Sequence, residues 1–133
     1  MKHMKRQMMI TGAFLAALAV ALGALGAHWL KTKLGSAELL NFETAVRYQM
    51  YHALAILFLA VLARDTNLKQ LRFPFYAFTL GILFFSGSIY FLATRTLTGL
   101  SASWIGPVTP LGGLLFISGW IYIIYLYTSK KAV

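Results

Sequence analysis

The chain has 133 residues, of which 59% are hydrophobic and 11% are charged. A typical soluble domain is about 45–50% apolar and about 25% charged, so this composition excludes an ordinary soluble domain and indicates one membrane domain, residues 1–133. The formal net charge is +9, but the basic residues lie between hydrophobic runs, where they set topology and contact anionic lipids rather than nucleic acid. There is no cysteine, which removes disulfides, Cys-ligated zinc and thiol catalysis.

The first hydrophobic run, residues 8–30, follows a short basic tail and contains no charged residue. About 20 apolar residues cross the hydrocarbon core of a bilayer, so the run predicts a first transmembrane helix. A cleaved signal peptide is the alternative, but the apolar part of a signal peptide is usually about 7–15 residues, which is shorter than this run. Ala19, Gly23 and Ala27 recur at intervals of four, a spacing that lets another helix backbone approach closely.

The second span is predicted over residues 42–63. It follows a polar connection, residues 31–41, with its turn at Gly35 and Ser36 and with Glu38 placed to cap a short helix. The polar side chains of this span lie between Glu43 and His52, and the residues that follow His52 are almost all apolar.

Two more spans follow the charged loop of residues 64–73. Pro74 suits the first turn of the third span, residues 75–93, because its missing N–H is no loss there. We expect a break near the end of that span at Ser86, Gly87 and Ser88. A loop over 94–106 leads to the fourth span, residues 108–127. Aromatic residues near several span ends fit the headgroup level: Trp29, Tyr76, Trp104, Tyr125 and Tyr127.

The distribution of basic residues predicts the orientation. Four spans put both termini on one side of the membrane, and that side carries eight of the twelve basic residues: Lys2, Lys5, Arg6, Arg64, Lys69, Arg72, Lys130 and Lys131. The opposite side carries the other four: Lys31, Lys33, Arg47 and Arg95. An excess of Lys and Arg marks the cytoplasmic face. We therefore predict a multi-pass plasma-membrane protein with both termini in the cytoplasm.

In this orientation the polar residues of the spans gather in the outer half of the bundle. The candidate cluster is His28, Glu43, Arg47, Tyr48, Gln49, His52, Ser86, Ser88, Tyr90 and Thr109. Ionisable groups at membrane depth are expensive and are a functional-site hypothesis by default. The cluster predicts one of two arrangements, a polar pocket that opens to the outer surface or a hydrogen-bonded plug that fixes the bundle.

Spacing within the second span suggests which groups meet. Glu43 and Arg47 are four residues apart, so we expect them to share a helix face and pair at the outer rim, with a ligand or proton role as the alternative. For His52 we expect a hydrogen bond across helices to Ser86, Ser88 or a tyrosine, with a proton relay or ligand role as the alternative.

Catalytic and metal-binding patterns are missing from the sequence. There is no GxSxG, phosphate loop or HExxH motif. Helix spacing puts His52 and Glu43 on opposite faces of one helix, which argues against a triad with Ser86. His28 and His52 lack a fixed metal-ligand spacing. We expect no enzyme activity, no metal and no cofactor.

Four ordered blocks of the chain resemble one family. They are GALGAHWL (23–30), FETAVRYQMYHALA (42–55), LFFSGSIYFLA (83–93) and GPVTPLGGLLFISGW (106–120). Together they resemble the small four-helix membrane family called domain of unknown function 423, which is similar to the animal transmembrane protein 256. The resemblance implies a retained first helix and no established activity. The loop over 94–105 looks longer than is usual in that family. Matching positions are Gly23, Gly26, His28, Glu43, Arg47, Tyr48, His52, Ser86, Gly87, Ser88, Thr109, Pro110, Gly112 and Gly113.

These observations predict an all-α, four-transmembrane-helix bundle. The leading functional hypothesis is a non-enzymatic binding or scaffold protein that contacts membrane lipids or a protein partner of unknown identity and supports membrane integrity. Helix packing, and with it self-association into a homo-oligomer, is expected at Gly23, Gly26, Gly87, Gly112 and Gly113. The alternative is a small, oligomeric transporter or channel that uses Glu43, Arg47 and His52. Transport needs access from both faces, and the inner half shows no polar path.

Overall fold

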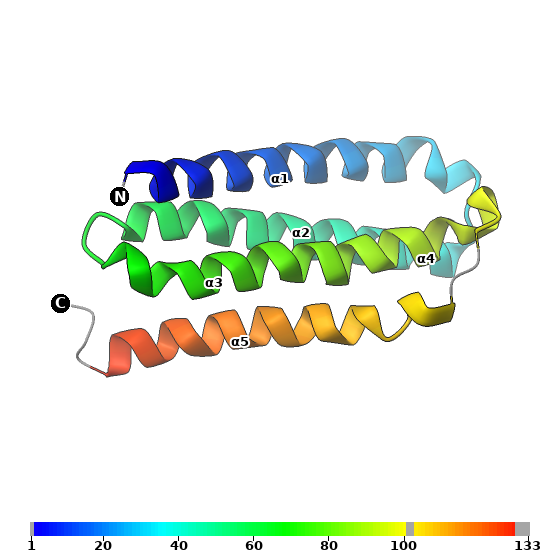
Figure 1. Cartoon of the computed structure of the whole chain (residues 1–133). Coiled ribbons are helices and arrows are strands. Elements are labelled where there is room, and N and C mark those ends of the chain that lie inside the picture. The colour runs from blue at the N-terminus through cyan, green and yellow to red at the C-terminus, as the bar shows by residue number, and fades with distance from the viewer. Residues whose placement is uncertain (1, 101–102, 130–133) are drawn as a thin grey trace.

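The computed structural model describes residues 2–100 and 103–129. Over these residues the chain is helical, with no strand (Figure 1). The long elements are α1 (Lys2–His28), α2 (Ser36–Leu62), α3 (Leu68–Gly81), α4 (Gly87–Thr98) and α5 (Val108–Thr128). A π-helical segment, η2 (Ile82–Ser86), joins α3 to α4 as one column, and two 3₁₀ turns, η1 (Leu30–Thr32) and η3 (Ser103–Ile105), lie in the connections.

The predicted four-helix membrane bundle is confirmed. Four helical segments of the described chain are long and apolar enough to span a membrane, namely His3–Thr32, Ser36–Leu62, Leu68–Thr98 and Ser103–Thr128. The expected spans fall on these four segments, one on each, and the helices extend beyond most of their predicted ends. Large apolar side chains such as Phe14, Phe58 and Ile121 are more than half exposed, as expected where the surrounding solvent is lipid.

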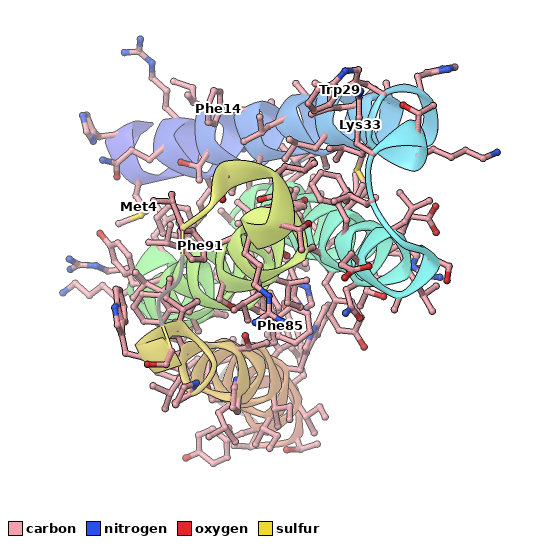
Figure 2. All side chains as sticks on the ribbon, turned by 90° about the vertical axis from the view of Figure 1, so that its right-hand side faces the viewer. Met4, Phe14, Trp29, Lys33, Phe85 and Phe91 are labelled. Carbon is pink, nitrogen blue, oxygen red and sulfur yellow. The ribbon has the colours of Figure 1, made fainter. Side chains whose placement is uncertain are left out.

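The four columns are arranged as a layered bundle. α1 packs mainly on α2, and α5 packs mainly on α3 and η2, so α1 and α5 form opposite flanks with the other columns between them (Figures 1 and 2). α1 begins and α5 ends at one end of the bundle, which we call the terminal end. The connections from α1 to α2 and from α4 to α5 lie at the other end, the connection end.

The apolar core has two parts. The larger cluster includes the fully buried Ile56, Leu59, Leu71 and Phe78, which come from α2 and α3. A smaller cluster of Leu30, Phe42 and Ala93 lies toward the connection end. Lipid tails are as apolar as these side chains, so helix association in a bilayer depends on close packing and interhelical hydrogen bonds more than on apolar burial.

Glycines permit the closest contact, where α5 meets the central column. A Cβ added at Gly112 would overlap the backbone of Phe85 in η2. At Gly119 an added Cβ would lie 2.6 Å from the Phe78 ring, and at Gly81 it would lie 2.5 Å from the Phe116 ring. Figure 2 shows Phe85 between the central column and α5. The glycines therefore set how closely α5 approaches.

The other expected packing glycines contribute less. An added Cβ would be 3.2 Å from Phe42 at Gly26, 3.4 Å from Val46 at Gly23 and 3.8 Å from Phe85 at Gly113. The expectation for Gly87 was wrong, because a Cβ there would meet nothing within 4 Å.

The third span is longer than the sequence indicated. The Asn67 side chain accepts a hydrogen bond of 2.9 Å from the backbone N–H of Lys69 and caps α3, so the helix begins inside the predicted charged loop. Pro74 consequently lies within α3 rather than in its first turn. At the other end, α4 continues to Thr98 and stops at Gly99, whose φ of 67° is the left-handed conformation typical of a helix C-terminus.

Candidate functional site

His52 links α2 to α5. Its Nδ1 donates to the backbone oxygen of Tyr48, one turn earlier, at 2.8 Å, because that carbonyl can only accept. Nε2 then carries no proton and accepts from the indole Nε1–H of Trp120 at 3.2 Å. The ring also stacks on Phe116, with centroids 3.5 Å apart and planes 10° from parallel. Both nitrogens are occupied and the imidazole is held as one neutral tautomer.

Gln49 joins three helices. Its Nε2 donates to the backbone oxygen of Leu15 in α1 at 2.9 Å, and its Oε1 accepts from the hydroxyl of Tyr90 in α4 at 2.9 Å. The side chain is 2% exposed. A buried amide is costly without partners, and here one donor and the acceptor atom are both used to hold helices together.

Two serines make further buried polar contacts. Ser86, in the π-helical segment, donates to the backbone oxygen of Ala45 in α2 at 2.8 Å. Ser88 of α4 donates to the backbone oxygen of Phe85 in η2 at 2.9 Å. Its hydroxyl oxygen also lies 2.6 Å from that of Thr109 in α5, at hydrogen-bond distance. These bonds tie the central column to α2 on one side and to α5 on the other.

We call one set of side chains the buried polar network after its buried members Gln49, His52, Ser86 and Ser88. The set also includes the half-buried Tyr90 and Thr109, and Trp120, which is 43% exposed. Within the described residues, no buried side-chain nitrogen or oxygen lacks a hydrogen-bond partner. The network therefore has the form of a hydrogen-bonded plug, the second of the two arrangements that the sequence allowed.

Four members of the sequence-predicted cluster lie outside this network. His28 is exposed at the end of α1, and Tyr48 is 40% exposed and packs its ring on Phe85. Arg47 Nη2 donates to Thr44 Oγ1 at 3.2 Å. Among the described residues Arg47 forms no ion pair with Glu43, so the expected pairing is wrong. Both side chains are exposed, which allows their charges to be solvated.

Glu43 and Arg47 are also separated from His52. They line a small cavity of about 220 Å³ on the α1 side of α2, together with Gly23, Gly26, Phe42 and Val46. The His52 ring lies on the side of α2 that faces α3 and α5, where it contacts Phe78, Phe116 and Trp120. The structure does not bring together the three residues on which the transport hypothesis depends.

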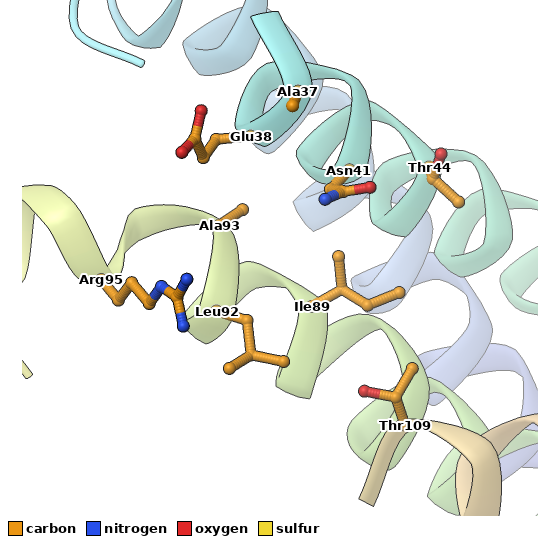
Figure 3. A pocket seen from close by; sticks show the side chains of 9 residues that line it. All are labelled: Ala37, Glu38, Asn41, Thr44, Ile89, Leu92, Ala93, Arg95 and Thr109. Atoms are coloured by element: carbon orange, nitrogen blue, oxygen red, sulfur yellow. The ribbon is translucent and has the colours of Figure 1, made fainter. Parts of the chain in front are cut away.

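A polar cleft of about 410 Å³ lies near the connection end, between α2, α4 and the start of α5. Figure 3 shows Glu38 and Asn41 on the α2 side and Arg95 on the α4 side, with Arg95 extending alongside Leu92. The cleft is lined by Ala37, Glu38, Asn41, Thr44, Ile89, Leu92, Ala93, Arg95 and Thr109. We call it the outer cleft. Its walls carry one negative and one positive side chain.

Sequence reasoning missed the residues that define these two features. Trp120 reads as one more apolar residue of a hydrophobic span, although its place in the middle of α5, away from the headgroup level, was an available signal. Glu38 and Arg95 were assigned to a connection and a loop. Both lie in terminal turns of helices, the first turn of α2 and the last turn of α4. Among the described residues no three His, Cys, Asp or Glu side chains group as metal ligands.

Comparison with known proteins finds that the chain is similar to membrane proteins of bacteria. A family model described as a protein of unknown function (DUF423) matches residues 22–113. The UPF0382 membrane protein of Haemophilus influenzae is 38% identical over 130 residues, covering 98% of this chain and 100% of that protein. The UPF0382 membrane protein SH2409 of Staphylococcus haemolyticus is 40% identical, covering 86% and 89%. YwdK of Bacillus subtilis is also 40% identical, covering 86% and 90%. No solved structure matches the chain.

Proposed function

Because this chain belongs to the DUF423 family of multi-pass membrane proteins, we propose that it is a non-enzymatic binding or scaffold protein of the cytoplasmic membrane. In this proposal it contacts lipids or a protein partner and supports membrane integrity. The names of its relatives describe membrane proteins and no reaction. The localisation is supported by the bacterial origin of those relatives.

The main observation behind the proposal is that both ring nitrogens of His52 are hydrogen-bonded. A proton relay or a general base needs a ring nitrogen that is free to exchange its proton or to reach a substrate. Both ring nitrogens of His52 are bound by protein groups, one on its own helix and one on α5. The bonds of Gln49 and Ser86 likewise go to other helices. This pattern supports a role for the buried polar network in fixing helix positions.

The orientation belongs to the same proposal. α1 begins at the terminal end and α5 ends there. The loop between α2 and α3 also lies at this end, with Arg64 in the loop and Lys69 in the first turn of α3. The excess of Lys and Arg at this end supports a cytoplasmic location for it. The outer cleft then faces the outside of the cell.

Reconstitution tests the proposal against transport. Purified protein in liposomes that enclose a pH-sensitive dye is expected to give the same proton leak as protein-free liposomes, with an applied potential of either sign. A leak that rises with the amount of protein would contradict the proposal. If His52→Leu and Glu43→Gln abolished that leak while the variants stayed folded, the transport alternative would replace it.

A further inference from the structure

Three polar side chains at the outer cleft form no hydrogen bond or ion pair with the rest of the described chain. Within the described residues, Glu38, Asn41 and Arg95 have no side-chain hydrogen bond and no ion pair. This contrasts with the buried polar network, where the polar atoms are satisfied. A carboxylate, an amide and a guanidinium from two helices therefore face one cavity with their hydrogen-bonding capacity available.

The cleft lies at the depth of lipid headgroups. Trp29 follows α1 and Trp104 lies in η3, both at the connection end, and they are 53% and 71% exposed. Exposed tryptophans at helix ends mark the membrane–water interface. Arg95, in the last turn of α4, lies near this level, whereas Ile89 and Leu92 are one to two turns deeper along the same helix. The α4 wall of the cleft is thus polar at the interface and apolar toward the hydrocarbon, while Thr44 and Thr109 add hydroxyl groups to the other walls.

We propose that the outer cleft binds an aminophospholipid, a lipid whose headgroup carries a phosphate and a primary ammonium. Arg95 holds the phosphate through charge-assisted hydrogen bonds. Glu38 accepts hydrogen bonds from the ammonium, and the Asn41 amide donates to an ester carbonyl of the glycerol region. An acyl chain lies along Ile89 and Leu92. This assignment rests on the proposed function, because it names the lipid that the protein binds.

The charges of the two walls select this headgroup. A purely anionic headgroup would satisfy Arg95 but would leave Glu38 without a cation. A choline headgroup supplies a cation that lacks N–H groups, so it cannot donate to the Glu38 carboxylate. Only a headgroup with both a phosphate and a primary ammonium complements both walls.

The test measures lipid affinity of the full chain by native mass spectrometry in mixed micelles. Phosphatidylethanolamine, phosphatidylcholine and phosphatidylglycerol with identical acyl chains are titrated separately. We expect phosphatidylethanolamine to bind about tenfold more tightly than the other two, the effect of one charge-assisted hydrogen bond. Glu38→Gln is expected to remove this preference, and Arg95→Gln to weaken phosphatidylethanolamine and phosphatidylcholine binding alike.

Matched variants and a soluble competitor complete the experiment. Lys33→Gln, at the same end, and Glu43→Gln, on the other side of α2, remove one charge each outside the cleft and are expected to bind lipid as the wild type does. Helix content by circular dichroism checks that each variant is folded. Arg95 is exposed in the last turn of α4, so its variant remains informative if Glu38→Gln does not fold. Phosphoethanolamine in solution is expected not to displace the lipid at equal concentration.

The outcomes separate the two proposals. If the wild type binds phospholipid without headgroup preference, or if both cleft variants behave as the controls do, the aminophospholipid site is overturned and lipid binding stands. If the wild type retains no phospholipid, both the aminophospholipid site and the lipid-binding part of the proposed function are overturned. Equal competition by phosphoethanolamine would overturn the assignment to a membrane lipid.

Discussion

At position 52 a histidine is fixed between a carbonyl of its own helix and an indole of α5. The carbonyl determines which nitrogen carries the proton, and the other nitrogen is then an acceptor for Trp120. Stacking on Phe116 fills the remaining space beside the ring. At this scale the polar residues of the bundle act as specific connections between helices.

Trp120→Phe tests this connection. The variant keeps an aromatic ring but removes the N–H donor, so Nε2 of His52 loses its partner. We expect the free energy of unfolding in detergent micelles to fall by about 0.5–2 kcal/mol, the range for interhelical hydrogen bonds in membranes. Trp104→Phe, at an exposed residue without such a bond, is the control. Equal stability of Trp120→Phe and the wild type would show that the bond contributes nothing.

Gln49→Leu removes two interhelical bonds at once. Leu has a similar volume, but Tyr90 and the Leu15 carbonyl lose their partner. We expect a loss of about 1–3 kcal/mol, measured by reversible denaturation in micelles. Gln7→Leu, on the exposed face of α1, controls for the change in composition. A variant as stable as this control would contradict the account of the network.

Part of the site was visible in the sequence, for a physical reason. Gln49, Ser86 and Ser88 stand out because polar side chains inside apolar spans need partners. Their partners were not visible, because hydrogen bonding across helices depends on how each helix is rotated about its axis. Three of the acceptors, Leu15, Ala45 and Tyr48, act through backbone carbonyls, which every residue carries.

At the scale of elements, the central column is shaped by its π-helical segment. η2 carries the backbone of Phe85 against Gly112 of α5. π-helical turns insert an extra residue in a helix and redirect the side chains around it. Here the Ser86 side chain faces α2 while the backbone of Phe85 contacts α5, so one segment meets two neighbours.

Gly112→Ala and Gly87→Ala form a matched pair of variants. The added methyl group at Gly112 overlaps backbone atoms, which cannot move aside as a flexible side chain can. We expect the midpoint of thermal unfolding to fall, with a cost of at least about 1–3 kcal/mol for overpacking. At Gly87 the methyl group enters open space, so stability is expected to stay equal or rise by up to about 1 kcal/mol. The same effect at both sites would contradict this packing.

The helix ends illustrate what hydropathy does not reveal. The four spans follow from apolar length alone. Hydropathy places the end of a span at the first charged residues after the hydrophobic run. The helix itself continues until a capping residue or a residue in the left-handed conformation ends it. Asn67 and Gly99 are such signals, and they were present in the sequence. The extra turns matter, because they bring Arg95 out of a loop and onto α4.

At the scale of the whole molecule, the bundle separates two kinds of polarity. The side chains that join helices by hydrogen bonds lie mostly inside it, and the charged side chains of the described residues lie toward its two ends. The connection end holds the outer cleft, and the terminal end carries most of the basic residues. Lys130 and Lys131, which contribute to that count, lie outside the described residues.

Single cysteines test the orientation without background, because the chain has none. Lys33→Cys, at the connection end, is expected to react with a membrane-impermeant maleimide that is added to spheroplasts, in which the cytoplasmic membrane is intact and its outer face is accessible. Lys69→Cys, at the terminal end, is expected to react only after the membrane is opened. The reverse labelling pattern would place the outer cleft in the cytoplasm and contradict the predicted topology.

The central claim is that the buried polar network is closed, and the ¹⁵N resonances of His52 in lipid bilayers test it most directly. We expect one neutral tautomer with the proton on Nδ1, a through-space contact from Nε2 to the indole of Trp120, and no exchange peak with water. A ring that averages between tautomers, or one that exchanges protons with water, would show an open network. In that case the polar groups would be available to a solute or a proton, and the transport alternative would be the better account.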